Sequence, residues 1–342
     1  MIFLLLFLAL LLAWAGTAGV RHYALARSVM DVPNERSSHS VPTPRGGGVA
    51  IVLSFLLALL LSWGMGLTDT RAMLALLLSG GWIALVGFID DHRHVPARWR
   101  LLGHFLGAAF LLYMLGGLPA LSFAGVRWDL GLFGSLLALF YLVWLLNLYN
   151  FMDGIDGIAS LEAITVCGGA ALCCWLAGAG AGSAAWLPLL LAAATAGFLA
   201  WNYPPARIFM GDAGSGFLGI MLGGLSLQAA WQAPQLFWSW LILLGAFVVD
   251  ATWTLARRLL RGERVHEAHR SHAYQRASRR LGQHRAISLS VAAINLIWLS
   301  PIAVFVALGR IDGVAGLFLA YAPLVLVVAS LGAGGPENGQ PK

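Results

Sequence analysis

Charged side chains are scarce in this sequence. Of its 342 residues, 11% are charged and 59% are hydrophobic. A soluble domain carries about 25% charged and roughly 45–50% apolar residues, so this chain has too little polar surface to cover itself in water. The composition predicts an integral membrane protein without a sizeable soluble domain, and it excludes soluble dinucleotide-binding enzymes.

Cysteine is also rare, and a disulfide scaffold is excluded. Cys167, Cys173 and Cys174 lie in one apolar run without the spacing of a zinc site, which indicates helix-packing residues. The net charge of +6 does not indicate nucleic acid as a partner, because the basic residues lie between apolar segments. There they act as topology signals.

Long apolar runs dominate the rest of the chain. At about 20 residues per crossing they predict an all-α polytopic membrane protein with about 11 transmembrane helices, whereas a β-barrel would show short alternating segments. The expected spans lie near 1–20, 46–65, 71–89, 101–117, 131–150, 160–178, 185–201, 216–231, 236–256, 286–307 and 314–334.

The basic residues predict the orientation. Arg21 and Arg27 follow the first span and no positive side chain precedes it, which favours a retained helix with its N-terminus outside. All lysines and arginines except Arg71, Arg127 and Arg310 then fall on the cytoplasmic side. We expect residues 1–342 to form a single integral membrane domain with cytoplasmic functional loops at 21–45, 90–100, 151–159, 202–215 and 257–285.

An acidic pair ends the third span in Gly87-Phe-Ile-Asp-Asp-His92. The C-terminus of a helix disfavours anions by about 0.3–1 kcal/mol each, and adjacent carboxylates repel each other. Two interpretations relieve this cost. Asp90 and Asp91 bind a cation such as Mg²⁺, or they form a solvated boundary pair neutralised by Arg93, Arg98 and Arg100.

Polar residues also end the fifth span. Asn147, Asn150 and Asp153 recur every three residues, so they share one helix face and should point into the protein or a cavity. The segment Asp153-Gly-Ile-Asp-Gly157 adds a second carboxylate, Asp156, among glycines that let a ligand approach the backbone. Interhelical hydrogen bonding is the structural alternative.

Two glycine-rich segments are typical of phosphate sites. Residues 202–216 end in Met-Gly-Asp212-Ala-Gly-Ser-Gly at a helix start, where backbone N–H groups favour phosphate and Asp212 can hold a metal. Arg45 precedes Gly46-Gly-Gly48. A plain N-cap explains Asp212 equally well, and a tight re-entry into the membrane explains the glycines.

The longest basic loop contains His266-Glu-Ala-His269-Arg-Ser-His272. The other spacings of a zinc site are missing, and neighbouring arginines such as Arg270 fit anion binding better. A lipid-headgroup patch is the alternative. Glu162 and Asp250 lie within apolar spans, where an acid indicates function, an internal salt bridge or an internal hydrogen bond.

Taken in order, these segments resemble the polyprenyl-phosphate N-acetylhexosamine-1-phosphate transferases, a glycosyltransferase 4 type of membrane enzyme. The resemblance covers Asp31 to about Gln275. It runs through Pro-Thr-Pro-Arg-Gly-Gly-Gly48, Phe-Ile-Asp-Asp91, Asn-Phe-Met-Asp-Gly-Ile-Asp-Gly157, Phe-Met-Gly-Asp-Ala-Gly-Ser215 and His269-Arg-Ser-His272. It implies transfer of a sugar-1-phosphate from a UDP-N-acetylhexosamine to undecaprenyl phosphate, with release of UMP. It also implies Mg²⁺, with Mn²⁺ as a substitute, in the bacterial inner membrane.

The same resemblance implies roles for single residues. Asp212, with Asp90 and Asp153, matches the metal site. Asp90 and Asp91 match the acidic pair near the lipid phosphate, where one acts as the base or as a metal partner. The donor site corresponds to Arg45, Asn150, Asp153, Gly154, Asp156, Asn202 and Phe209. His269, Arg270 and His272 match a loop that closes over the diphosphate.

The chain departs from the peptidoglycan branch of that family. That branch has a longer run of histidines and a lysine near its first glycine motif, whereas the single lysine here is Lys342. The chain therefore resembles the branch that initiates O-antigen and related polysaccharides more than the phospho-MurNAc-pentapeptide transferases. A lipid-linked sugar transporter or flippase and a structural membrane subunit are the competing classes, and a homodimer is compatible with all of them.

Overall fold

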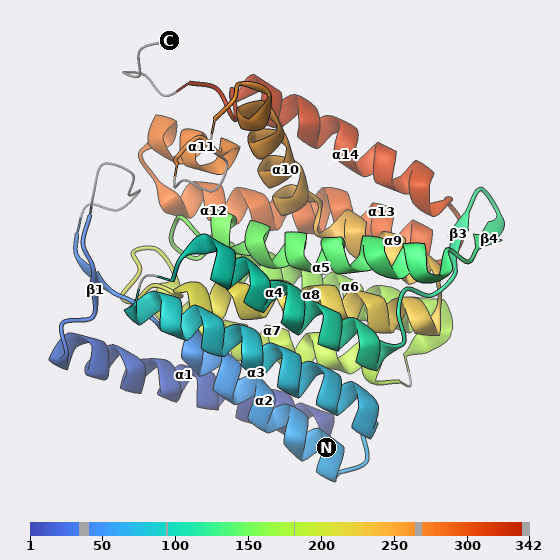
Figure 1. Cartoon of the computed structure of the whole chain (residues 1–342), viewed down its shortest axis with the longest axis horizontal. Coiled ribbons are helices and arrows are strands. Elements are labelled where there is room, and N and C mark those ends of the chain that lie inside the picture. Colours follow the sequence, from blue (N-terminus) through green and yellow to red (C-terminus); the bar gives the residue numbers. More distant parts are fainter. Residues whose placement is uncertain (34–40, 94, 181, 264–268, 337–342) are drawn as a thin grey trace.

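The structure, a computed structural model, describes residues 1–33, 41–93, 95–180, 182–263 and 269–336, and they form one bundle of helices (Figure 1). Two short antiparallel pairs, β1 (Met30–Asp31) with β2 (Thr43–Pro44) and β3 (Leu121–Phe123) with β4 (Val126–Trp128), lie at its ends. The helices are α1 (Ile2–Ala26), α2 (Gly48–Gly64), α3 (Thr70–His92), α4 (Ala97–Leu115), α5 (Gly131–Met152), α6 (Ile158–Cys174), α7 (Ser183–Asn202), α8 (Asp212–Gln232), α9 (Gln235–Leu243), α10 (Gly245–Leu260), α11 (Ala273–Leu281), α12 (His284–Ala293), α13 (Ser300–Ala307) and α14 (Gly313–Ser330). Two π-helical turns, η1 (Trp175–Ala179) and η2 (Ile294–Leu299), extend α6 and join α12 to α13. The prediction of an all-α polytopic membrane protein is confirmed.

Each expected span coincides with a helix or with consecutive helices. Within the described residues, eight helices are long and apolar enough to cross a membrane, or up to nine if α9 and α10, which are bent by 69°, count as one span. The other two expected spans are α2 and α4. Helix α2 has only 17 residues, and the first turn of α4 carries two charged residues, Arg98 and Arg100. The number that these criteria support is therefore lower than the predicted eleven.

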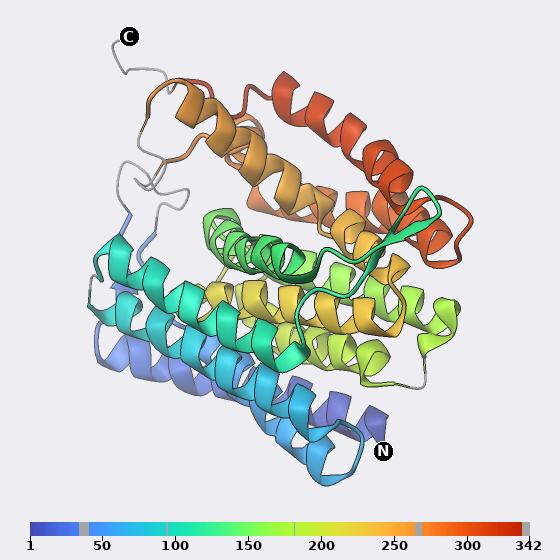
Figure 2. The ribbon, with the colours of Figure 1, turned by 45° about the vertical axis from the view of Figure 1, so that its right-hand side comes forward.

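Helix α8 is the centre of the bundle (Figures 1 and 2). Its apolar stretch is fully buried, and it packs against α3 and α5. Small residues permit this close packing. A Cβ added at Gly219 would lie 2.6 Å from the Cα of Leu146 in α5. The central position of α8 places its N-terminal residue, Asp212, among the ends of several other helices.

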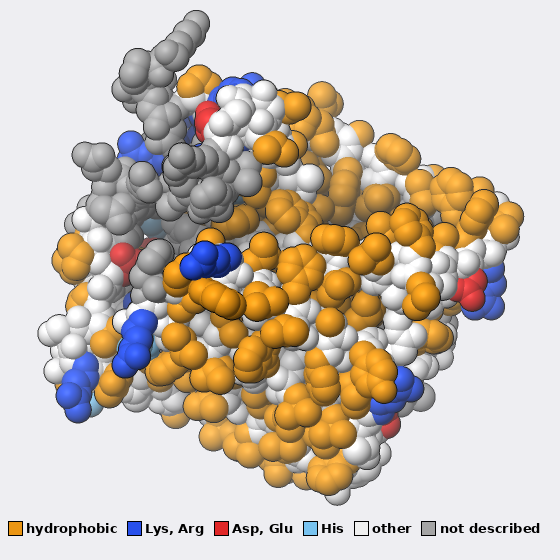
Figure 3. Space-filling view, viewed as in Figure 1, with side chains coloured by type: hydrophobic (Ala, Val, Ile, Leu, Met, Phe, Trp, Pro, Cys, Tyr) orange, Lys and Arg blue, Asp and Glu red, His pale blue; other side chains and the backbone are white. Residues whose placement is uncertain are grey.

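The outer surface is apolar over most of the length of the bundle, and basic side chains gather mainly near its ends (Figure 3). Large hydrophobic side chains are exposed on the outer helices, including Phe3 (84%), Leu132 (91%) and Phe318 (74%). Such a continuous apolar surface matches the hydrocarbon core of a bilayer.

One acid lies deep inside this bundle. Glu162 in α6 is fully buried and accepts a hydrogen bond of 2.6 Å from Asn295, in the π-helical turn η2. Asn295 also donates to the hydroxyl of Thr165. The structure therefore supports the internal hydrogen bond as the explanation of Glu162.

Candidate active site

Loop segments that are far apart in the sequence meet at one end of the bundle. They enclose a cavity of about 240 Å³, lined by Asp31, Arg45, Asn150, Asp153, Gly154, Ile155, Asp156, Asn202, Phe209, Met210, Gly211, Asp212, Ser215, Gln275 and His284. Every residue that the resemblance assigned to the donor site is in this lining. The structure therefore brings these residues together around one cavity, and their roles stay predictions.

The carboxylate of Asp91, at the end of α3, holds the start of α8. It accepts backbone N–H bonds from Asp212 (3.0 Å) and Ala213 (3.2 Å). Its Oδ1 also lies 2.8 Å from Nη2 of Arg45, and its side chain is 3% exposed. The positive end of the α8 dipole and Arg45 therefore both stabilise the charge on Asp91.

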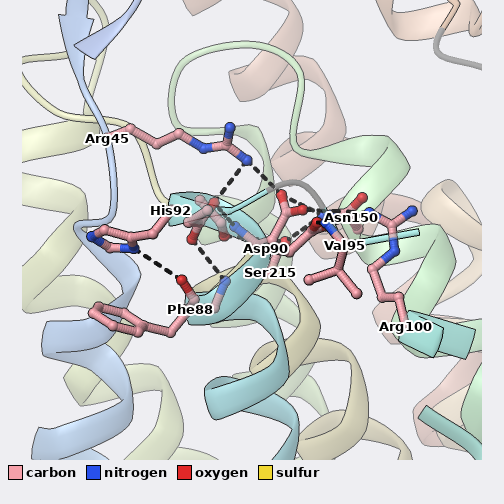
Figure 4. A network of polar contacts seen from close by, with 12 residues as sticks. Arg45, Phe88, Asp90, His92, Val95, Arg100, Asn150 and Ser215 are labelled. Atoms are coloured by element: carbon pink, nitrogen blue, oxygen red, sulfur yellow. Dashed lines mark hydrogen bonds and ion pairs between the residues drawn. The ribbon is translucent and has the colours of Figure 1, made fainter. Parts of the chain in front are cut away.

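The neighbouring carboxylate, Asp90, is held by α4. Arg100 Nη1 lies 2.5 Å from Oδ2, and the backbone N–H of Val95 donates to Oδ1 over 2.9 Å (Figure 4). Of the arginines that the second interpretation named, Arg100 pairs with Asp90, whereas Asp91 pairs with Arg45 from another segment. Asp90 and Asp91 lie beside the cavity and are not part of its lining. A metal role for Asp90 requires its ion pair with Arg100 to open.

Asp212 connects this acidic pair to the cavity. Its Oδ1 accepts hydrogen bonds from Arg45 Nη2 (2.7 Å) and Asn150 Nδ2 (3.0 Å), and Asn150 also donates to Ser215. Figure 4 shows Arg45 reaching over two carboxylates, with Asn150 approaching from the other side. Asn150 therefore points into the protein, as its helix position predicted.

Backbone contacts fix the segment that carries Arg45. The carbonyl of Phe209 accepts from the N–H of Gly47, and that of Met210 accepts from Gly48, both at 2.9 Å. Gly211 has a φ of +80°, a conformation that glycine adopts without strain, and an added Cβ would lie 2.7 Å from Asp91 Oδ2. The glycines therefore allow the segment that carries Arg45 and the segment before α8 to approach each other closely.

We expect Gly87→Ala to destabilise the junction of α3 and α8. A Cβ at Gly87 would lie 2.5 Å from the backbone oxygen of Asp212, which cannot move without shifting the start of α8. Overpacking of this kind costs about 1–3 kcal/mol. Thermal unfolding in detergent should show a lower melting temperature. Gly81→Ala is the control on the same helix, because the nearest atom to its added Cβ is 3.9 Å away. Equal melting of the two variants would contradict the prediction.

Asp153 is a partly buried acid in the cavity. It follows α5 and lines the cavity. Burial raises the pKa of its carboxyl well above the ordinary value, and the nearby carboxylate of Asp212 raises it further. A divalent cation relieves both effects.

The donor atoms fit a metal that is shared with a substrate. Among the residues that the structure describes, no three His, Cys, Asp or Glu side chains form a group that could hold a metal ion. Mg²⁺ usually binds through one or two carboxylates and completes its shell with water and substrate phosphates. Asp153 and Asp212, with the amide of Asn150 beside them, match that smaller set.

Asn202 and Phe209 line the cavity from the segment between α7 and α8. Asn202 is buried, accepts the N–H of Gly157 and donates to the carbonyl of Ile208, both at 2.9 Å. It therefore ties the loop after α5 to the segment before α8. The structure gives Asn202 a positioning role that the sequence did not indicate.

The described part of the histidine segment is packed inside the protein. His272 is 1% exposed, with its Nδ1 3.3 Å from Asp250, and it stacks on His269 at 4.8 Å. The carbonyl of Arg270 accepts a hydrogen bond from Arg279. None of these three residues lines the cavity as described, and His266 lies outside the described residues. Gln275 is the nearest residue of this segment that does line it.

Asp250 is explained by this packing. From α10 it accepts the backbone N–H groups of Ala273 (2.9 Å) and Tyr274 (3.0 Å) at the start of α11. The structure therefore supports internal hydrogen bonding as the explanation of this buried acid.

Comparison with known proteins agrees with this site. The sequence model described as Glycosyl transferase family 4 matches residues 73–230, which include Asp90, Asp153 and Asp212. The chain is 29% identical to the probable undecaprenyl-phosphate N-acetylglucosaminyl 1-phosphate transferase of Bacillus subtilis (strain 168), over 84% of each chain. It is 28% identical to the decaprenyl-phosphate N-acetylglucosaminephosphotransferase of Mycolicibacterium smegmatis, over 97% of this chain and 89% of the relative. These similarities support the polyprenyl-phosphate N-acetylhexosamine-1-phosphate transferase family for this chain.

Four residues with polar side chains in the cavity lining were not predicted. Asp31, Ser215, Gln275 and His284 line the cavity in addition to the expected residues. Asp31, Ser215 and Gln275 lie in or next to the recognised motifs, so their position in the sequence was an available signal. His284 lies 12 residues after the last motif, at the start of α12, and only the fold brings it to the cavity.

Proposed function

We propose that this chain transfers a sugar-1-phosphate from a UDP-N-acetylhexosamine to a polyprenyl phosphate and releases UMP. The observation that carries the proposal is the acidic and arginine-containing cavity at one end of a membrane bundle. The names of the family 4 relatives describe N-acetylglucosamine-1-phosphate transfer to undecaprenyl or decaprenyl phosphate. UDP-N-acetylglucosamine is therefore the first donor to test.

The cavity suits an anionic donor. Arg45 lies between Asp91 and Asp212 and lines the cavity, where its guanidinium can pair with phosphate oxygens. Asp153 and Asp212 would hold Mg²⁺ together with the diphosphate, and the ion would offset the negative charge that accumulates there. Phe209, Asn202 and Gly154 form the wall expected to contact the nucleoside.

The acceptor is expected on the side of Asp90 and Arg100. A lipid phosphate is already anionic at neutral pH and needs no strong base. In the direct route, its oxygen attacks the sugar-proximal phosphorus, and the bond to the bridging oxygen breaks. That oxygen leaves with UMP, and the sugar-1-phosphate is joined to the lipid through a new diphosphate. Asp90 and Asp91 stay in their arginine pairs and position Arg45 and Arg100.

We expect purified protein to release UMP from UDP-N-acetylglucosamine only when both undecaprenyl phosphate and Mg²⁺ are present. A panel of UDP-sugars identifies the donor, and replacement of Mg²⁺ by Mn²⁺ tests the choice of metal. Release of one UMP per enzyme without acceptor would show an aspartyl-phosphate intermediate and rule out the direct route. Failure to release UMP from any donor, by protein that elutes and melts as folded, would overturn the proposed function.

The cellular setting follows from this chemistry. The family 4 relatives are bacterial proteins, and a UDP-sugar is available in the cytoplasm, so we place the cavity at the inner face of the cytoplasmic membrane. The expected orientation of the arginine-rich loops agrees with this assignment. The product would begin an O-antigen or a related envelope polysaccharide.

A further inference from the structure

The first turn of α12 contacts the loop that follows α5. His284 Nδ1 lies 3.1 Å from Oδ1 of Asp156, and the two side chains are 19% and 12% exposed. A hydrogen bond to a charged partner is stronger than one between neutral groups. This contact therefore fixes the direction in which the Asp156 carboxylate points.

Asp156 is held from two other directions. The backbone N–H of Ala206 donates to its Oδ2 over 3.0 Å. The hydroxyl of Ser288, one turn after His284 on α12, donates to its backbone carbonyl over 2.7 Å. Of these contacts, the one from His284 is made to Oδ1. Removing it leaves the hydrogen bonds from Ala206 and Ser288 in place and takes one partner away from the carboxylate.

A second cavity lies on the other side of this pair. Its volume is about 590 Å³, and it is lined in part by the connection between α11 and α12 and by Pro204 and Pro205. Asp156, Phe209 and His284 line both cavities, so they form the wall between them. Arg285 lies 5.7 Å from the ring of Tyr203 and joins α12 to the same wall.

We propose that His284 is a positioning residue for the nucleotide donor. Through Nδ1 it holds the Asp156 carboxylate in the wall of the cavity that takes the UDP-sugar, and it thereby sets the affinity for the nucleotide. The inference rests on the proposed function. It concerns donor binding and leaves the rate of the chemical step unchanged, because His284 acts through Asp156.

Three substitutions separate the two ring nitrogens. The amide nitrogen of Asn takes the place of Nδ1, and that of Gln takes the place of Nε2. We expect His284→Ala and His284→Gln to raise the KM for the UDP-sugar and the Kd for UMP about tenfold, with kcat changed less than twofold. His284→Asn should restore both constants to near the wild-type values.

Calorimetric titration of the full-length protein in detergent with UMP, together with steady-state UMP release, tests this. Ser290→Ala is the control on the same helix, since its hydroxyl bonds only to Ala286 O among the described residues. Unchanged UMP binding by His284→Ala, or rescue by Gln and not by Asn, would overturn the inference. If His284→Ala does not fold, the comparison of Asn with Gln decides. Folded wild-type protein that binds no UMP would overturn the proposed function, and the inference with it.

Discussion

Asp212→Asn is expected to lower the rate of UMP release at least about 100-fold, because it removes the carboxylate on which the site converges. Asp212 accepts hydrogen bonds from Arg45 and Asn150 and lies next to Asp153 in the cavity. The amide keeps the size of the side chain but loses the charge that would bind a cation and orient Arg45. Loss of one group that stabilises charge in the transition state typically costs a factor of about 10²–10³.

The measurement is UMP release from UDP-N-acetylglucosamine over a range of Mg²⁺ concentrations. The variant should reach a low plateau that added Mg²⁺ does not restore, while its elution and melting temperature in detergent stay close to wild type. Asp129→Asn is the control, since Asp129 is an exposed acid that bonds to the N–H of Gly131 in a loop outside the cavity. A rate within about threefold of wild type would refute the metal assignment.

The gathering of the cavity residues could be predicted from the sequence because membrane topology limits where a polar residue can lie. Asn150, Asp153 and Asp212 each lie at the end of an apolar span, and charge counting places these ends on the same side. When the spans cross the membrane in alternating directions, few arrangements of the helices keep these three polar residues apart. The order of the motifs and their location on one side of the membrane were therefore enough to predict a shared pocket.

The pairing of charges could not be predicted in the same way. The sequence left a cation and arginines as alternatives for Asp90 and Asp91. The choice depends on Arg45 and Arg100, which come from two other segments. The start of α8 also contributes backbone N–H groups, whose direction is set by tertiary packing.

The number of membrane spans could not be predicted from the sequence for a different reason. Apolar runs locate helices well, but they do not reveal how each helix is oriented or where it bends. The sequence across α9 and α10 predicts one continuous span, yet the two helices are bent by 69° after Leu243. As a result α10 brings Asp250 to the start of α11, a contact between residues 23 and 24 positions apart.

That contact leads to the second large expected effect. Asp250 is 3% exposed, and its two oxygens accept from Ala273, Tyr274 and Thr254. Replacement by Ala leaves two backbone N–H groups at the start of α11 without their acceptor. Each buried unsatisfied donor costs about 1–3 kcal/mol. We expect Asp250→Ala to lower the stability by about 3 kcal/mol.

The same substitution should also reduce turnover, although Asp250 does not line the cavity. Burial raises the pKa of Tyr274 well above the ordinary value, and the carboxylates of Asp250 and Asp153 add to this effect, so its hydroxyl stays protonated. That hydroxyl donates to the carbonyl of Phe151 over 3.0 Å and lies against Gly154. Movement of α11 therefore reaches the loop that carries Asp153. A displacement of about 1 Å at a reacting centre can cost about 100-fold in rate.

Melting curves and UMP release measured on the same preparations test both effects. Thr254→Val removes one donor and leaves the two backbone contacts, so it should cost less than about 1 kcal/mol and preserve turnover. Asp250→Asn should lower the stability by less than Asp250→Ala and by more than Thr254→Val, because an amide oxygen can still cap the start of α11. If Asp250→Ala melts at a lower temperature but turns over normally below that temperature, α11 does not position the loop at Asp153. The route from α10 to the cavity would then be wrong.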